Sequence, residues 1–227
     1  MKTTTRFRTL LTAMTLSVGV LTSCQKETVV ADDPTRGFSA DIRKIVPDAI
    51  INDLRSRGMV INEGKVPPKL NGTFRASPYT LLSPYGSDDS FEAGDVINDY
   101  VYKFYGQNTT NAISYDYTNY SSDTGTGKGA FVAGNGTLFT IFSEDTGIAR
   151  GVPYKTVSII SGEVTAGGIR NFQYAFVVKE KTGDAGDQTL IPVNTGRIWL
   201  DGDKLATTDA GGRIGVPMRE AVSQLTR

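Results

Sequence analysis

The first residue with the chemistry for a reactive site is Cys24, the single cysteine of the 227-residue chain, in the stretch LTSCQKE. A disulfide within one chain needs a second cysteine, which the sequence lacks. A catalytic thiolate needs a neighbouring base, usually histidine, and the sequence contains no histidine. The same absence excludes Ser-His-Asp catalysis and histidine-ligated zinc or iron sites. The sequence therefore predicts a non-enzymatic protein, with no catalytic, cofactor-binding or metal-binding residues.

The residues before Cys24 indicate what this cysteine does. Residues 1–9 carry three basic side chains, and residues 10–21 form an apolar stretch diluted by Thr and Ser. This is the layout of a secretory signal peptide, and the stretch is shorter than the roughly 20 residues of a membrane-spanning helix. The sequence LTSC resembles the lipobox of bacterial lipoproteins, in which the cysteine is lipidated. The resemblance implies a signal peptide over residues 1–23 and a lipid anchor on Cys24 in the bacterial cell envelope.

The residues after Cys24 are polar and predict a lipidated tether over residues 24–38. Gln25-Lys26-Glu27 resembles the acid-containing tag that many Bacteroidota lipoproteins carry after the lipidated cysteine. In that group the tag implies exposure on the surface of the outer membrane. The alternative is an ordinary flexible tether, which leaves the leaflet of the membrane open.

Composition limits the classes of protein to which the remaining residues belong. The chain has 24 basic and 24 acidic residues, and removal of three basic residues with the signal peptide leaves 21 against 24. No basic patch or run of like charge occurs, which argues against nucleic-acid binding and electrostatic membrane binding. The 25 Gly, 10 Tyr and 10 Phe residues are typical of a β-rich secreted domain.

Residues 39–58 predict a helical segment, because apolar side chains recur at steps of three and four. Ser39 is placed to cap its N-terminus and Gly58 to end it, while Pro47 is expected to split it in two. We expect its apolar face to pack on the domain that follows, with a docking surface as the alternative. The face consists of Ile42, Ile45, Val46, Ala49, Ile50 and Leu54.

Strand-like runs separated by glycine-rich turns fill the rest of the chain. We expect an antiparallel up-and-down barrel of about eight strands, lipocalin-like, over residues 70–205; the alternative is a two-sheet β-sandwich. Residues 206–227 form a C-terminal extension with a short helix. The expected strands lie near residues 72–83, 96–106, 112–119, 128–134, 137–144, 154–162, 169–180 and 195–201.

Aromatic residues alternate with polar ones along several of these strands and predict the inner face of the barrel. They either line a site for a small apolar ligand or fill a packed core, because an eight-stranded barrel is just wide enough for side chains. In the last strand either Ile198 or Trp199 faces inward. The nine aromatic residues are Tyr100, Tyr102, Phe104, Tyr115, Tyr117, Phe139, Phe172, Tyr174 and Phe176.

Three weaker motifs are interpreted as turns. The glycine-rich stretch around Lys128 lacks the Gly and Ser/Thr spacing of a phosphate-binding loop. The acidic stretch SDDSFEAGD and the stretch DGDK at residues 201–204 do not match the spacing of a twelve-residue calcium loop.

An alternative function, binding of a protein or glycan partner, is motivated by tyrosines in turn regions, which are frequent in binding surfaces. These are Tyr79, Tyr85, Tyr105 and Tyr120.

The stretches GMVINEGKVPPKLNGTF, DYVYKFYGQ, ISYDY and GRIWLDGDKLA are similar to those of a group of small Bacteroidota lipoproteins with a lipocalin-like (calycin-like) barrel. The resemblance covers most of residues 40–205. Residues 71–74 lie where lipocalins place Gly-x-Trp at the start of the first strand, with Phe74 in place of the Trp. The resemblance implies a barrel preceded by a helix, and it implies no particular ligand.

Overall fold

The β-rich composition produces a mainly β domain in the computed structural model of the chain, which describes residues 37–120, 124–186, 189–209 and 225. The predicted signal peptide, Cys24 and the tether up to residue 36 lie outside the described residues, as does the predicted C-terminal helix. The helices are α1 (Ala40–Ile45) and α2 (Asp48–Ser56). The strands are β1 (Lys65–Val66), β2 (Gly72–Ala76), β3 (Tyr79–Ser83), β4 (Val96–Ile97), β5 (Tyr100–Tyr105), β6 (Ala112–Thr118), β7 (Thr124–Asn135), β8 (Leu138–Ala149), β9 (Val152–Thr165), β10 (Gly168–Lys181), β11 (Gly196–Asp201) and β12 (Leu205–Thr208).

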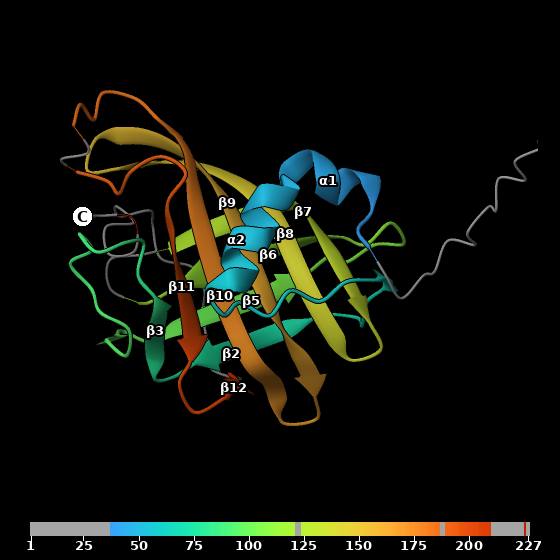
Figure 1. The fold of residues 1–227 in the computed structure, drawn as a ribbon. Helices are drawn as coiled ribbons and strands as arrows, with labels where there is room; N and C mark the ends of the chain where they lie inside the picture. The colour runs from blue at the N-terminus through green and yellow to red at the C-terminus, as the bar shows by residue number, and fades with distance from the viewer. Residues whose placement is uncertain (1–36, 121–123, 187–188, 210–224, 226–227) are drawn as a thin grey trace, which may run out of the picture. The chain divides into compact units, whose positions relative to one another are not determined.

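Antiparallel pairing joins eight strands into a ring. From β5 to β10 each strand pairs with the next one in the chain, β2 pairs with β5, and β12 pairs with both β2 and β10. The order β12–β2–β5–β6–β7–β8–β9–β10 therefore returns to its start (Figure 1). The ring confirms the predicted antiparallel barrel of about eight strands, in place of a two-sheet sandwich.

The barrel wall divides where β10 meets the last strands of the chain. One part of β10 pairs with β12, which closes the ring. The next part pairs with β11, which continues the sheet to β3 and β4. Because β12 is part of the ring, the barrel extends to residue 208, and residues 206–208 belong to it rather than to a C-terminal extension.

The interior of the barrel contains the predicted aromatic face. Eight of the nine aromatic side chains are buried, and Tyr117 is partly buried against the same cluster. Trp199 belongs to this cluster too, whereas Ile198 packs outside the barrel with the helices. The side chain that faces inward from β11, the last strand expected from the sequence, is therefore Trp199.

The helices α1 and α2 lie across the outside of the barrel (Figure 1). The Ser39 side-chain oxygen accepts a hydrogen bond from the Ile42 backbone N–H at 3.3 Å, and Pro47 is the N-cap of α2. The cap at Ser39 and the split at Pro47 are thus confirmed. None of the helices in the described part of the chain has both the length and the apolar character that crossing a membrane requires. The apolar contact comprises Phe38, Ile42, Val46, Ile51, Leu54, Met59 and Ile61 against Ala133, Phe142, Val157, Ile159, Ala175, Val177 and Ile198.

Residues 124–127, predicted as part of a glycine-rich turn, belong instead to β7. Gly127 pairs with Tyr115 and Gly125 with Tyr117 on the adjacent strand. A Cβ atom at either glycine would collide with the ring of its partner tyrosine. These glycines therefore make room for two aromatic rings of the interior, which a motif search for turns does not reveal.

Candidate functional site

A bulge in β10 opens the barrel wall. β10 pairs with β12 through residue 170 and with β11 from residue 173, so Asn171 and Phe172 lie between the two pairings. On the β9 side the register also shifts between residues 170 and 173. Asn171 has a positive φ of 51°, and its N–H donates to the carbonyl of Lys204 at 2.9 Å. Such bulges re-aim side chains and commonly lie beside functional sites.

The turn between β11 and β12 lies next to the bulge. Asp201 ends β11, and the following turn places Lys204 at a positive φ of 70°. The Gly202 N–H donates to the carbonyl of Pro78 at 2.8 Å, which ties the turn to the junction between β2 and β3. The bulge and the turn are thus both held by backbone hydrogen bonds.

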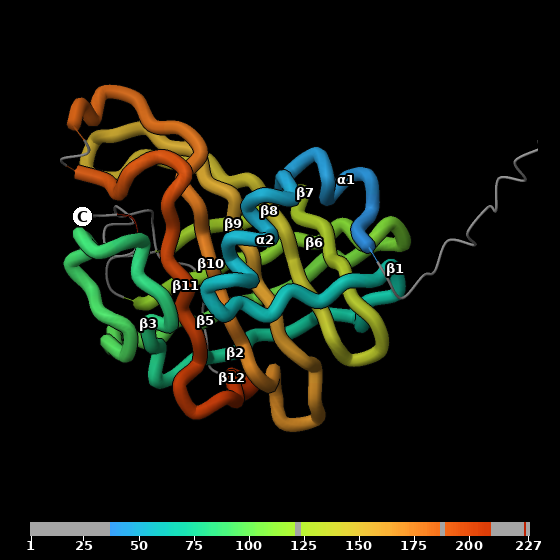
Figure 2. Tube along the Cα trace, in the orientation of Figure 1, coloured from blue at the N-terminus to red at the C-terminus, as the bar shows by residue number. Residues whose placement is uncertain are grey.

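The segment after α2 crosses the outside of the barrel and forms the third side of the site (Figure 2). The side-chain oxygen of Gln173 accepts the Val60 N–H at 2.7 Å, and its amide nitrogen donates to the carbonyl of Gly58 at 3.3 Å. The Asn62 N–H donates to the hydroxyl of Thr140 at 2.7 Å. Strand side chains therefore fix this segment to β8 and β10.

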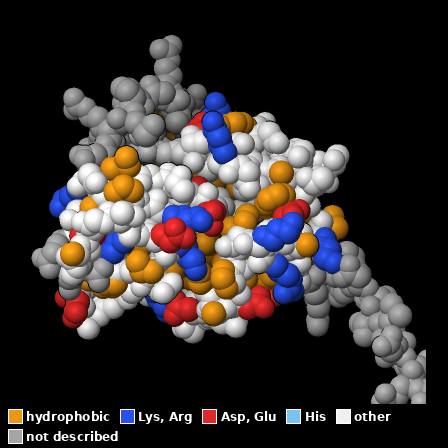
Figure 3. Space-filling view, turned by 90° about the horizontal axis from the view of Figure 1, so that it is seen from above, with side chains coloured by type: hydrophobic (Ala, Val, Ile, Leu, Met, Phe, Trp, Pro, Cys, Tyr) orange, Lys and Arg blue, Asp and Glu red, His pale blue; other side chains and the backbone are white. Residues whose placement is uncertain are grey.

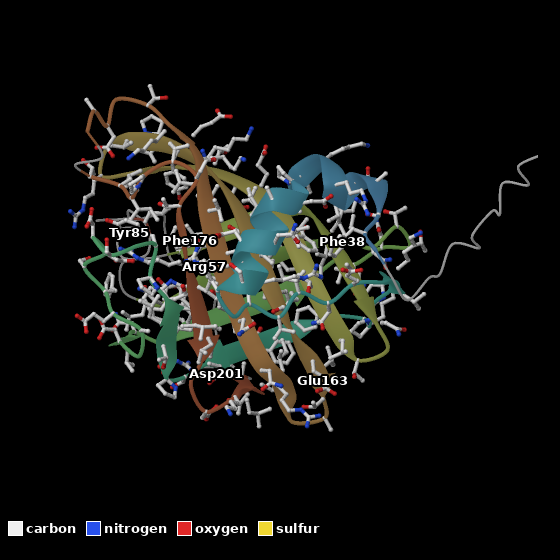
Figure 4. The ribbon with its side chains drawn as sticks, viewed as in Figure 1. Phe38, Arg57, Tyr85, Glu163, Phe176 and Asp201 are labelled. Atoms are coloured by element: carbon white, nitrogen blue, oxygen red, sulfur yellow. The ribbon has the colours of Figure 1, made fainter. Side chains whose placement is uncertain are left out.

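These three elements, together with residues of β8 and β9, border a partly open pocket of about 230 Å³, which we call the wall pocket. Apolar and charged side chains both line it. Figure 4 shows Glu163 and Asp201, two of its lining residues, at the same end of the barrel. The lining residues are Val60, Asn62, Leu138, Gly162, Glu163, Asn171, Phe172, Gln173, Leu200, Asp201 and Lys204.

Asp201 is the one lining residue with a buried polar atom that lacks a partner in the described part of the chain. Its side chain is buried, its Oδ1 accepts the Asp203 N–H at 3.3 Å, and its Oδ2 has no hydrogen-bond partner there. Burial, followed by a hydrogen bond with the Asp203 side chain and the charge of that carboxylate, raises the pKa of Asp201 to about 7, although the backbone N–H groups of Asp203 and Ser77 act to lower it. Near neutral pH, Asp201 therefore exists in both its charged and its neutral form.

Two further charged residues lie at the wall pocket. The Glu163 carboxylate forms an ion pair with Arg170 at 3.1 Å and accepts the Thr137 hydroxyl at 3.2 Å. Lys204 is exposed. Val60 and Leu138, also exposed, give the pocket an apolar rim. The wall pocket thus combines an apolar surface with a buried carboxyl group.

The nine aromatic residues predicted as ligand-lining contact one another inside the barrel. The ring centroids of Tyr102 and Phe172 are 4.9 Å apart, and those of Phe104 and Phe139 are 6.4 Å apart. The ring centroid of each of the nine residues lies within 6.5 Å of the centroid of another ring in the cluster. These contacts favour the packed-core interpretation, while a ligand-lining role for these residues stays a prediction. Of the nine, Phe172 also lines the wall pocket.

The acidic stretch over residues 87–95 is anchored by a buried ion pair. Both the Nε and the Nη2 of Arg197 donate to the Asp89 carboxylate, at distances between 2.6 and 3.1 Å, and both side chains are almost fully buried. The Arg197 guanidinium also lies over the rings of Tyr85 and Phe91. Asp89 is therefore a structural residue rather than part of a solvated turn.

The partly buried carboxyl group of Asp145 lies in a hydroxyl network. The hydroxyls of Ser143 and Tyr115 each donate to its carboxylate at 3.3 Å. Burial raises the pKa of Asp145 and raises that of Tyr115 well above its ordinary value. Hydroxyl groups of the chain therefore supply the hydrogen bonds that the Asp145 carboxylate needs.

The tyrosines predicted for partner binding do not form one surface. Tyr79 is fully buried in β3, where its hydroxyl hydrogen-bonds that of Tyr102 at 3.0 Å, so its predicted exposure is wrong. Tyr85 and Tyr105 are half-buried, and Tyr120 is exposed. On the face shown in Figure 3, positive and negative side chains are interspersed with apolar ones. This face therefore has no single-sign field.

Comparisons with known proteins leave the geometry as the main guide. No family model, no curated protein and no solved structure matches the chain. Within the described residues, no group of three His, Cys, Asp or Glu side chains is placed to hold a metal ion.

Proposed function

We propose that the chain is a non-enzymatic, lipid-anchored protein of the bacterial outer membrane that binds a small ligand in the wall pocket. The anchor rests on the LTSC sequence at Cys24 and the signal-like residues before it. The ligand site rests on one observation. Asp201, which lines the wall pocket, has a buried carboxyl oxygen without a partner in the described residues. Leaving such an oxygen unpaired costs about 1–3 kcal/mol, which a ligand that donates a hydrogen bond recovers.

The size of the wall pocket matches a small molecule. Its volume of about 230 Å³ exceeds the ~150 Å³ of a cavity known to hold benzene and is below the ~300 Å³ of the smallest drug-sized sites. A single ring with one or two substituents matches this volume. Val60, Leu138 and Leu200 offer it aliphatic contact.

The wall pocket is a better candidate than the barrel interior for the ligand site. The interior rings contact one another. The ring centroid of Tyr102, for example, is 4.9 Å from that of Phe172 and 5.9 Å from that of Tyr117. A ligand among these rings would have to displace them, at a cost similar to that of overpacking a core, about 1–3 kcal/mol. A ligand in the wall pocket displaces no side chain of this cluster.

Binding in the wall pocket is tested with a library of ring-sized fragments and NMR of ¹³C-labelled methyl groups in the purified protein. We expect hits to shift the methyl signals of Val60, Leu138 and Leu200. Val60→Trp should abolish the shifts of Leu138 and Leu200, because Val60 is 54% exposed and an indole there fills the pocket rim. Val66→Trp is the matched control, since Val66 is 59% exposed and does not line the pocket.

Two results would contradict the proposal. Hits that shift only methyl signals of the interior, such as those of Ile141 and Ile160, would mean that the ligand binds in the barrel interior and not in the wall pocket. Absence of any hit would remove the ligand-binding role. The anchor is tested separately by labelling with a radioactive fatty acid, which should mark the wild type and not Cys24→Ala.

A further inference from the structure

We propose that the wall pocket recognises a small primary amine with an apolar body. Its ammonium group would contact Asp201, and its body would lie against Val60, Leu138 and Leu200. This inference rests on the proposed function, because it names the ligand class of the same pocket. It is carried by the position of Asp201 and by the roles of the other polar side chains around it.

The ligand must supply a hydrogen-bond donor. The Oδ2 of Asp201 is buried and lacks a donor in the described part of the chain, while its Oδ1 accepts the Asp203 N–H. Glu163 lines the same cavity with a second carboxylate. An anionic ligand group placed at the Oδ2 of Asp201 would meet an oxygen that cannot donate a hydrogen bond when ionised and that repels its charge, so an anion at this position is disfavoured, although Lys204 lines the same pocket.

An ammonium group meets the requirements of Asp201 better than a hydroxyl group does. A hydrogen bond between an ammonium and a carboxylate is roughly twice as strong as one between neutral groups. A hydroxyl leaves the charged form of Asp201 buried without a counter-charge, whereas an ammonium supplies that charge. Binding of a cation would also favour the ionised carboxylate, since an opposite charge nearby lowers the pKa of a carboxyl group.

The rest of the lining indicates a single charge and an apolar body. The Gln173 amide is already bonded to Val60 and Gly58, and the Asn62 amide nitrogen donates to the Phe139 carbonyl at 2.9 Å. Lys204 contributes a positive charge to the same cavity, which disfavours a second cationic group on the ligand. A monoamine therefore fits the lining better than a polyamine or a sugar with many hydroxyls.

Three probes of nearly equal shape test the inference: benzylamine, benzyl alcohol and benzoate. They are titrated into the purified protein at pH 8 and pH 5 while the methyl signals of Val60, Leu138 and Leu200 are followed. At pH 8 we expect benzylamine to bind at least about tenfold more tightly than benzyl alcohol, as a charge-assisted bond implies, and benzoate not to bind. At pH 5 the preference should shrink, because Asp201 is then mostly protonated.

Two variants assign the preference to Asp201. Asp201→Asn should make benzylamine and benzyl alcohol bind about equally, since the amide keeps the shape and loses the charge. Asp145→Asn should keep the preference, because Asp145 is another carboxyl group with a raised pKa and does not line the pocket. Equal affinities in the wild type, or a preference that survives Asp201→Asn, would overturn the amine class and leave the binding function standing. Failure of all three probes would overturn the amine inference, while the fragment screen would still test the pocket on its own.

Discussion

The two ends of β11 accommodate a buried carboxyl group in opposite ways. Near the start of the strand, Arg197 pairs with Asp89 through three donor–acceptor contacts of 2.6–3.1 Å. The backbone N–H groups of Tyr85 and Phe91 donate to the same carboxylate. At the end of the strand, the Oδ1 of Asp201 accepts the Asp203 N–H at 3.3 Å, and its Oδ2 has no hydrogen-bond partner in the described residues.

The pKa values of the two groups follow from these partners. Burial acts to raise the pKa of Asp89, but the hydrogen bonds from Arg197, Tyr85 and Phe91 outweigh it and the pKa is lowered. Burial raises the pKa of Asp201 as well, and Asp203 raises it further, to about 7. Burial alone therefore does not mark a ligand site. The informative feature is a buried group whose partner the fold does not supply.

The largest expected effect on stability comes from removing the ion-pair partner of Asp89 near the start of β11. Arg197→Met leaves the Asp89 carboxylate buried without its counter-charge, and we expect a loss of about 3–5 kcal/mol in the free energy of unfolding. Urea denaturation at pH 7 measures it. Arg43→Met is the control, because the Arg43–Asp48 pair is exposed and should contribute at most about 1 kcal/mol.

A double variant separates the ion pair from the packing around it. In Asp89→Leu/Arg197→Met neither charge remains, so much of the lost stability should return. If the double variant is as unstable as Arg197→Met, the contacts of the guanidinium with the rings of Tyr85 and Phe91 carry the stability instead.

At the unsatisfied end, Asp201→Asn should stabilise the protein in a pH-dependent way. The folded-state pKa of Asp201 is about 7 against an ordinary 3.8, so between these values the folded protein holds a proton that the unfolded chain releases. The contribution of Asp201 to the stability of the wild type therefore falls as pH rises from about 4 to 7 and is level above that range. Asparagine removes this fall. We expect the variant to be more stable by on the order of 1–2 kcal/mol at pH 8 and to match the wild type at pH 4.

Denaturation of both proteins at several pH values measures this difference. A constant difference between wild type and variant across pH 4–8 would mean that the proton on Asp201 does not contribute to stability. Asp48→Asn serves as a control, because Asp48 is exposed on α2 and its replacement should leave the pH dependence of the wild type unchanged.

The sequence predicted the barrel because alternation is a local signal. Residues such as Phe172, Tyr174 and Phe176 must share one face of any strand that contains them, so the inner face could be recognised without a structure. The helix break at Pro47 was equally local, because proline lacks the backbone N–H that a continuous helix needs.

The wall pocket could not be predicted, because its parts meet only through long-range pairing. The segment with Val60 reaches Gln173 on β10, more than a hundred positions along the chain. The sequence could not decide whether Ile198 or Trp199 faces inward for a similar reason. Both residues are apolar, and both faces of β11 are buried. The stretch DGDK looked like an ordinary turn, and the burial of Asp201 is a property of its neighbours rather than of its spacing.

The smallest expected effect concerns why the pKa of Asp201 is raised while that of Asp89, near the other end of β11, is lowered. Asp203 raises the pKa of Asp201 through a hydrogen bond and through its charge, but burial is the larger cause. Asp203→Asn should therefore lower the pKa of Asp201 below 7 and leave it above the ordinary 3.8. A ¹³C NMR titration of the Asp201 carboxyl carbon measures this change. Benzylamine binding should then begin at a lower pH than in the wild type, because Asp201 ionises earlier. An unchanged pKa would show that Asp203 does not contribute and that burial without a counter-charge accounts for the raised pKa of Asp201, whereas Asp89, also buried, has Arg197 as its partner.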